Sequence, residues 1–140
     1  QNIDGLHQAA GSKNVIELHG SVHRNYCMNC KKFYPLDFVL NSSGVPRCSC
    51  GGIVKPDVVL YEEPLNDKAI EDANLLIQKA DVLIVGGTSL NVYPAAGLIN
   101  FFRGKHLILI NKTQTPADRS AKMIIREPIG EVLGKAVLDR

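Results

Sequence analysis

Long apolar runs, clusters of like charge and glycine-rich phosphate motifs are all missing from this chain of 140 residues. No apolar stretch approaches the roughly 18 residues that a membrane-spanning helix needs, so we expect no transmembrane segment. The net charge is only +2, without a basic tail or stripe, which argues against direct binding to nucleic acid or to a membrane surface. The sequence therefore predicts a soluble domain, and we expect it in the cytoplasm.

The beginning of the chain lacks a methionine, a signal peptide and a basic leader. It consists of three polar residues around one isoleucine (Gln1–Asp4), which run into a turn-prone Asp-Gly pair. Such a stretch is typical of the inside of a loop. Either processing has exposed this end, or the chain is part of a longer protein.

From Val58 onward, apolar strands alternate with helical patterns. The strand-sized apolar runs are Val58–Tyr61, Val82–Val85 and Leu107–Ile110. Asn66 or Asp67 is placed to cap a helix, and further helices are expected after Pro94 and after Pro128. This β-α-β-α-β order predicts an α/β fold with a parallel sheet and right-handed crossovers.

All four cysteines fall between residues 25 and 54, in a stretch rich in Gly, Asn and Ser. They form two close pairs, Cys27 with Cys30 and Cys48 with Cys50. Two such knuckles can close one tetrahedral zinc site, as in a zinc ribbon. Two disulfides or buried free thiols are the alternatives, and disulfides would need an oxidising compartment.

A zinc ion held by four thiolates has no open coordination position, so its role would be structural. The second pair is irregular, because one residue rather than two separates Cys48 from Cys50. His23 is an alternative ligand, although an exposed loop histidine is the simpler interpretation.

Three other places are candidates for chemistry. Gly86–Ser89 follows one expected strand and Asn111 follows the next, at the sheet edge where open parallel sheets bind ligands. An ordinary strand-to-helix turn explains the first equally well, and neither G-x-G-x-x-G nor a phosphate loop occurs. His19, between an expected strand at Val15–Leu18 and Gly20, is either a general base or a satisfied, half-buried histidine.

In combination, these motifs resemble those of the sirtuins, NAD-dependent protein-lysine deacylases. QNID comes first, Leu-His-Gly begins at Leu18, and the cysteine pairs, KPDVVLYEE, GTSLNVYP and Ile-Asn follow in the family's order. The likeness runs from Gln1 to about Val137. In sirtuins, QNID is preceded by the first part of a Rossmann domain with a Gly-Ala-Gly phosphate loop. The resemblance therefore implies a C-terminal portion of a sirtuin, with the missing N-terminal segment as its partner.

The resemblance implies part of a Rossmann-like parallel sheet with helices, plus a small zinc-ribbon module. We accordingly divide the chain into a catalytic loop and strand (1–24), a zinc-binding module (25–54) and the C-terminal part of the NAD-binding domain (55–140).

The resemblance also assigns roles to single residues. His19 corresponds to the catalytic base, and Asn2 and Asp4 correspond to catalytic groups at the nicotinamide end of NAD. The cofactor-binding residues would be Gln1, Asn2, Ile3, Asp4, Gly87, Thr88, Ser89, Asn111, Lys112, Pro128 and Ile129. The residues that contact the acyl-lysine substrate would be Val59, Leu60 and Tyr61. The ligands of a structural zinc would be Cys27, Cys30, Cys48 and Cys50.

The implied function is the removal of acyl groups, such as acetyl, from protein lysines, with nicotinamide and O-acyl-ADP-ribose as products. Without the phosphate loop, the isolated chain is expected to bind NAD poorly and to be inactive. A non-catalytic zinc-ribbon interaction module and a sirtuin-like ADP-ribosyltransferase are the alternatives. The chain departs from the family's usual Phe-Gly-Glu at Tyr61-Glu62-Glu63, and has Lys55 where an arginine is common.

Overall fold

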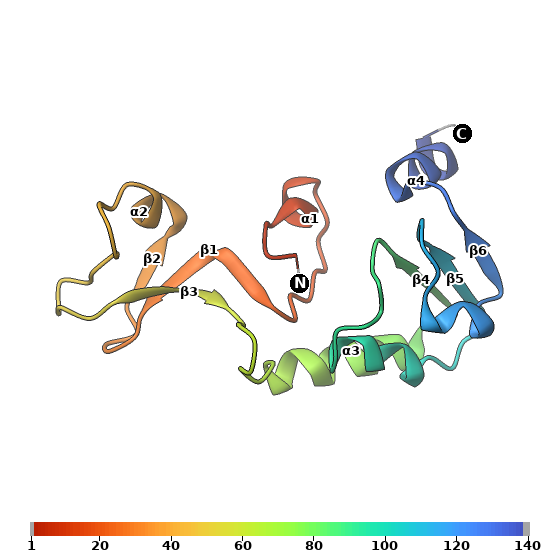
Figure 1. The fold of residues 1–140 in the computed structure, drawn as a ribbon, viewed down its shortest axis with the longest axis horizontal. Coiled ribbons are helices and arrows are strands. Elements are labelled where there is room, and N and C mark those ends of the chain that lie inside the picture. The colour runs from red at the N-terminus through yellow and green to blue at the C-terminus, as the bar shows by residue number, and fades with distance from the viewer. Residues whose placement is uncertain (1, 139–140) are drawn as a thin grey trace. The chain divides into compact units, whose positions relative to one another are not determined.

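The computed structural model describes residues 2–138, except for the side chain of Leu138. These residues belong to two compact units, Gln1–Ile70 and Glu71–Arg140, and each contains its own sheet (Figure 1). Within the described residues, no helix has the length and the apolar character needed to cross a membrane. The two units are described separately below.

The first unit contains an antiparallel sheet of three strands in the order β2-β1-β3. Its elements are α1 (Leu6–Ala9), β1 (Gly20–Cys27), β2 (Phe33–Pro35), α2 (Leu36–Leu40) and β3 (Val54–Val58). Its small core consists of Cys27, Tyr34, Cys48 and Val54, against which Phe38 and Val39 pack. Two of these four buried residues are cysteines of the cluster, so the core of this unit and the cysteine cluster share Cys27 and Cys48.

Strand β1 is irregular in its middle. Ser21 pairs with Asp57 and Asn25 pairs with Pro56, so residues 22–24 have no partner on β3 and form a bulge. Bulges bend a strand and redirect its side chains. The bulge makes residues 22–24 available for other contacts.

The second unit contains a parallel sheet in the order β4-β5-β6. Its elements are α3 (Asp67–Lys79), which begins in the first unit, β4 (Val82–Gly86), the 3₁₀ helix η1 (Ala95–Phe101), β5 (His106–Ile110), the 3₁₀ helix η2 (Pro116–Ser120), β6 (Met123–Ile125) and α4 (Ile129–Leu138). The core consists of Leu107, Leu109 and Ala117, with partly buried apolar side chains around them. The predicted α/β fold with a parallel sheet is confirmed.

Several predicted elements are confirmed in detail. The runs at Val82–Val85 and Leu107–Ile110 form β4 and β5, and a helix follows Pro128. The backbone N–H of Ala69 donates to Asn66 Oδ1 at 3.0 Å, so Asn66 caps α3. The segment after Pro94 is helical but adopts the tighter 3₁₀ form.

The expected strand at Val15–Leu18 is wrong, because these residues are in no strand and β1 begins only at Gly20. Gly20 has a φ of 78°, and a Cβ at this position would strike the carbonyl of Asp57. The chain therefore turns sharply at Gly20 before it joins the sheet.

The run at Val58–Tyr61 is also misplaced, since the strand covers Val54–Val58 and pairs antiparallel with β1. A turn stops the strand: the Glu63 carboxylate accepts the Leu60 N–H at 2.9 Å, and the Glu63 N–H donates to the Leu60 carbonyl at 3.1 Å. The third strand of the parallel sheet is instead β6, which sequence patterns did not reveal.

Candidate functional site

The four cysteine sulfurs form one cluster in the first unit. All four Sγ atoms lie within 4.8 Å of one another, and three of the Sγ–Sγ distances are 3.5 Å. None of the cysteines is in a disulfide. A tetrahedral zinc with Zn–S bonds of about 2.3 Å needs sulfurs roughly 3.8 Å apart, so the donor set fits a zinc ion. Among the described residues, His23 does not belong to the cluster.

Hydrogen bonds favour the thiolate form of the two buried cysteines. Cys48 Sγ accepts the N–H of Cys50 at 3.5 Å and the hydroxyl of Tyr34 at 3.1 Å, and these donors lower the pKa of Cys48 to about 5. The backbone N–H of Cys30 similarly lowers the pKa of Cys27. A Cβ on Gly52 would strike Cys27 Sγ, so glycine is required there. Sequence reasoning did not assign Tyr34 to this site.

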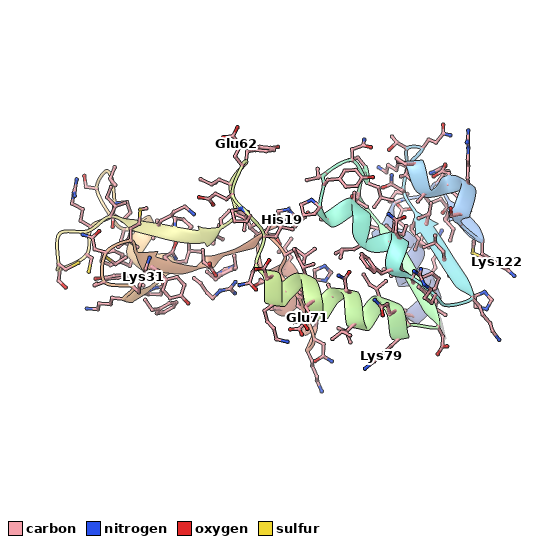
Figure 2. All side chains as sticks on the ribbon, turned by 90° about the horizontal axis from the view of Figure 1, so that it is seen from below. His19, Lys31, Glu62, Glu71, Lys79 and Lys122 are labelled. Carbon is pink, nitrogen blue, oxygen red and sulfur yellow. The ribbon has the colours of Figure 1, made fainter. Side chains whose placement is uncertain are left out.

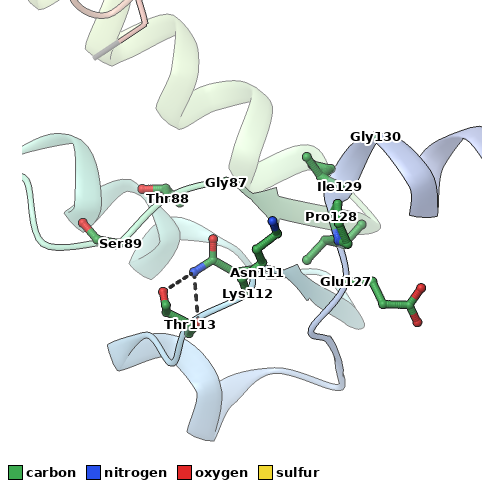
Figure 3. A pocket seen from close by; sticks show the side chains of 11 residues that line it. Gly87, Thr88, Ser89, Asn111, Lys112, Thr113, Glu127, Pro128, Ile129 and Gly130 are labelled. Carbon is green, nitrogen blue, oxygen red and sulfur yellow. Dashed lines mark hydrogen bonds between the residues drawn. The ribbon is translucent and has the colours of Figure 1, made fainter.

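A pocket of about 430 Å³ lies in the second unit, where the parallel strands end (Figure 3). It is lined by every cofactor-binding residue predicted in this unit: Gly87, Thr88, Ser89, Asn111, Lys112, Pro128 and Ile129. Ile110, Thr113, Glu127 and Gly130 complete the lining. All four adjoin predicted residues in the sequence, and that adjacency is the signal that could have found them.

Backbone hydrogen bonds bring these segments together. The N–H of Gly87 donates to the carbonyl of Ile110 at 3.2 Å, and the N–H of Asn111 donates to that of Ile125 at 3.0 Å. Gly87 has a φ of 63°, and nothing lies within 4 Å of where its Cβ would be, so its backbone is open to a ligand. By contrast, the side chain of Ile129 fills the space where Gly86 would carry a Cβ.

Asn111 is the polar residue most enclosed in this pocket, with only 9% of its surface exposed. Its amide nitrogen donates to the carbonyl of Thr113 at 3.0 Å and to the hydroxyl of Thr113 at 3.3 Å (Figure 3). Its amide oxygen has no hydrogen-bond partner among the described residues and can accept from a ligand hydroxyl. Lys112 adds a positive charge that suits a phosphate group.

His19 lies half-buried, directly before β1 (Figure 2). Its carbonyl accepts the N–H of Val59 at 3.1 Å, whereas its ring has no hydrogen-bond partner among the described residues. Burial lowers the pKa of the imidazole below its ordinary value of 6.5. The ring is therefore neutral at physiological pH and can accept a proton.

The other predicted residues of the first unit lie at the same end of β1. The Ile3 carbonyl accepts the N–H of Val22 at 3.1 Å, and Asp4 Oδ1 accepts the N–H of Leu6 at 3.0 Å. Asn2 is exposed, and Gln1 lies outside the described residues. In the expected substrate segment, Leu60 and Tyr61 are exposed, whereas Val59 is half-buried beside His19.

Comparison with known proteins assigns the chain to a family. A family model described as the Sir2 family matches residues 1–94. An NAD-dependent protein deacetylase of Clostridium perfringens is 67% identical over 139 residues, and one of Clostridium tetani is 63% identical over 139 residues. Both alignments cover 98% of this chain, but they cover 57% and 56% of the relatives, so the chain spans little more than half their length.

Solved structures give the same result. A Sir2 structure with a p53 peptide and NAD⁺ is similar with a TM-score of 0.90 and 40% identity, over 99% of this chain and 60% of that one. A Sir2 bound to a propionylated peptide is similar with a TM-score of 0.90 and 41% identity, over 99% of this chain and 61% of that one. The chain therefore belongs to the Sir2 family, the sirtuins.

Proposed function

We propose that the full-length protein containing this chain is an NAD-dependent protein-lysine deacylase. The observation that carries this proposal is the state of His19. Its ring is half-buried and free of hydrogen bonds among the described residues, with a lowered pKa, and its carbonyl is bonded to the segment expected to bind substrate. These are the properties that a general base needs.

In this proposal, the pocket in the second unit binds the adenosine half of NAD. The free oxygen of Asn111 would accept a hydrogen bond from a ribose hydroxyl, and the open backbone at Gly87 would approach the phosphates. Thr88 and Ser89 offer hydroxyl donors, and Lys112 offers a positive charge. In this proposal, the pocket of the second unit binds the nucleotide, and residues of the first unit act on the nicotinamide end of NAD.

When bound, NAD supplies an activated ribose carbon that takes up the acyl oxygen of the substrate as nicotinamide leaves. In this proposal, Asn2 and Asp4 orient the reacting ribose, and His19 takes a proton from one of its hydroxyls. Val59–Tyr61 hold the peptide in an extended conformation. Desolvation disfavours a free lysine ammonium at an apolar site, so a neutral acyl-lysine is the preferred substrate.

Zinc has no part in these steps. The cluster supplies four sulfur ligands, which fill a tetrahedral coordination sphere and leave no position for substrate. We propose that the metal only stabilises the antiparallel sheet of the first unit, next to which His19 lies.

Product analysis tests the proposal. The full-length protein is incubated with NAD and an acetyl-lysine peptide, and the products are identified by mass spectrometry. We expect free lysine peptide, nicotinamide and O-acetyl-ADP-ribose in equal amounts. A peptide that gains ADP-ribose and keeps its acetyl group would indicate the transferase alternative, and the absence of any NAD-dependent product would favour a non-catalytic interaction module.

The 140-residue chain alone should be inactive. The pyrophosphate of a dinucleotide is usually held by a glycine-rich turn and a helix N-terminus, and this sequence contains no such motif. Calorimetry with NAD tests this point. Micromolar affinity of the isolated chain would show that its nucleotide site needs nothing further.

A further inference from the structure

Two residues of the bulge at residues 22–24 of β1 contact the Asn2–Asp4 segment, and the third forms ion pairs beside it in the bulge. The N–H of Val22 donates to the Ile3 carbonyl at 3.1 Å, and His23 Nε2 lies 2.9 Å from the Asp4 carbonyl oxygen. Arg24 Nη1 donates to Glu17 Oε2 at 2.6 Å, and Arg24 Nε donates to Asp57 Oδ2 at 2.9 Å. Val22 and His23 thus contact a segment that lies about nineteen residues earlier in the sequence, whereas Arg24 connects β1 to Glu17 and to Asp57 of β3.

His23 fits this segment by shape as well as by hydrogen bonding. Gly5 has a φ of 69°, and a Cβ on it would strike Cδ2 and Nε2 of the His23 ring. The ring therefore occupies space that only a glycine leaves open, next to the carbonyl that it contacts. The His23 backbone is fixed in turn, since its N–H donates to Ser21 Oγ at 3.2 Å.

The bulge releases His23 from the sheet. In a regular strand, the register set by Ser21 and Asp57 would pair His23 with Lys55, but residues 22–24 have no partner on β3 and the His23 N–H donates to Ser21 Oγ instead. Bulges next to active sites commonly redirect side chains in this way. Here the ring of His23 points toward the segment that contains Asn2 and Asp4.

We propose that the bulge at residues 22–24 positions the Asn2–Asp4 segment for NAD, and that His23 is the positioning residue on which this depends. The inference rests on the proposed function, in which Asn2 and Asp4 contact the nicotinamide end of the cofactor. His23 itself touches no substrate; it acts through the Asp4 carbonyl.

A matched pair of substitutions tests whether the effect of His23 comes from its hydrogen bond to the Asp4 carbonyl or only from the volume of its side chain. In His23→Gln the amide nitrogen stands about as far from the backbone as Nε2, so it can still donate to the Asp4 carbonyl. In His23→Asn the amide nitrogen stands at the place of Nδ1 and falls short. His106→Ala, which removes an exposed histidine of the second unit, is the control.

Steady-state kinetics of the full-length protein give the first measurement. His23→Ala and His23→Asn should raise the KM for NAD about tenfold, the effect of roughly one lost hydrogen bond, with the KM for the acyl-peptide unchanged. His23→Gln should restore the KM for NAD to near the wild-type value, and His106→Ala should not alter it. Equal KM values for NAD in all the His23 variants and the wild type, or a Gln variant as impaired as the Asn variant, would overturn the inference while leaving the deacylase activity established.

Amide hydrogen exchange on the 140-residue chain gives a second measurement that does not depend on turnover. His23→Ala should speed exchange at Val22 and Leu6, whose N–H groups bond to Ile3 and Asp4, by about tenfold. The amide of Met28, which donates to the Ile53 carbonyl, should be unaffected. If the wild-type protein shows no turnover, the proposed function fails, and unchanged exchange at Val22 and Leu6 would then refute the positioning role separately.

Discussion

The two units of this chain are stabilised in different ways. The first has a three-stranded antiparallel sheet whose few buried residues include two cysteines of the cluster. The second has a parallel sheet with an aliphatic core around Leu107 and Leu109, and no metal cluster among its described residues. A small domain with little core commonly relies on metal ligands, because metal binding supplies folding free energy directly.

The proposed functional residues are divided in the same way. The proposed base, His19, and the Asn2–Asp4 segment lie in irregular stretches next to β1, whereas the proposed nucleotide pocket is formed by the ends of parallel strands. Reactive groups on loops need a rigid support. We therefore expect the metal to stabilise the region around His19 and the Asn2–Asp4 segment, and the aliphatic core to stabilise the proposed nucleotide pocket.

Removal of the metal should cause the largest loss of structure, and this loss should be confined to the first unit. We expect a strong chelator or Cys48→Ser to abolish zinc binding and to unfold the region from Gly20 to Val58, because the thiolates are part of its core. The parallel sheet should keep its structure. Amide hydrogen exchange with and without zinc, together with metal analysis, checks both statements.

Equal loss of protection in β4 and β5 after chelation would contradict this division. So would a Cys48→Ser variant that retains one zinc per chain. Ser49→Ala, which changes the residue between the two ligands but leaves four thiolates, serves as the control.

The reciprocal experiment destabilises the second unit by creating a cavity in its core. Leu109 is 1% exposed, and truncation of a buried leucine to alanine costs about 2–5 kcal/mol. Leu109→Ala should therefore lower the free energy of unfolding of the second unit by that amount, without changing the zinc content. Chemical denaturation followed by exchange of the β5 amides measures this effect; zinc loss at the same denaturant concentration as β5 unfolding would show that the units are not independent.

A smaller effect is expected at the start of α3. Asn66 Oδ1 accepts the N–H of Ala69, and loss of such a cap costs about 0.5–2 kcal/mol. Asn66→Ala should reduce helix protection by this amount, and Asn66→Asp should largely preserve it. If Asn66→Ala and Asn66→Asp had the same stability in urea, the cap would have no role.

The smallest effect depends on pH and concerns Asp118. Burial acts to raise its pKa, but hydrogen bonds from Thr115 and the Arg126 guanidinium outweigh this and hold the pKa below its ordinary value. Its stabilising contribution should therefore be complete above about pH 4 and fade as the pH falls through the lowered pKa. Asp118→Asn should be less stable than wild type at neutral pH, and the gap should close in acid; a constant gap from pH 7 to pH 2 would exclude this linkage.

Sequence patterns could predict the second unit better than the first. Continuous apolar runs mark β4 and β5, and the pocket follows because parallel strands present their carboxyl ends at one edge. Strand β1 was harder, since its inward positions include Ser21 and Asn25, which are polar yet fully buried. The Asn25 amide donates to the carbonyls of Val22 and Tyr34, so its burial depends on tertiary contacts that periodicity cannot reveal.

The candidate site shows the same limit. The cysteine spacing predicts the cluster, and the family motifs predict the residues that line the pocket. The contact between His23 and Asp4 could not be predicted, because it depends on a bulge and on the left-handed backbone of Gly5. Spacing along the sequence carries no signal for either feature.

The most direct test of the central claim compares NAD binding with turnover in His19→Ala of the full-length protein. We expect NAD to bind with nearly wild-type affinity, while formation of nicotinamide and deacylated peptide falls by about 10²–10⁴-fold, because the lost group is a proton acceptor. Activity of the wild type should decline only below about pH 6.5, since burial lowers the pKa of His19. His106→Ala should behave as wild type; near-normal turnover in His19→Ala would contradict the assignment of His19 as the base.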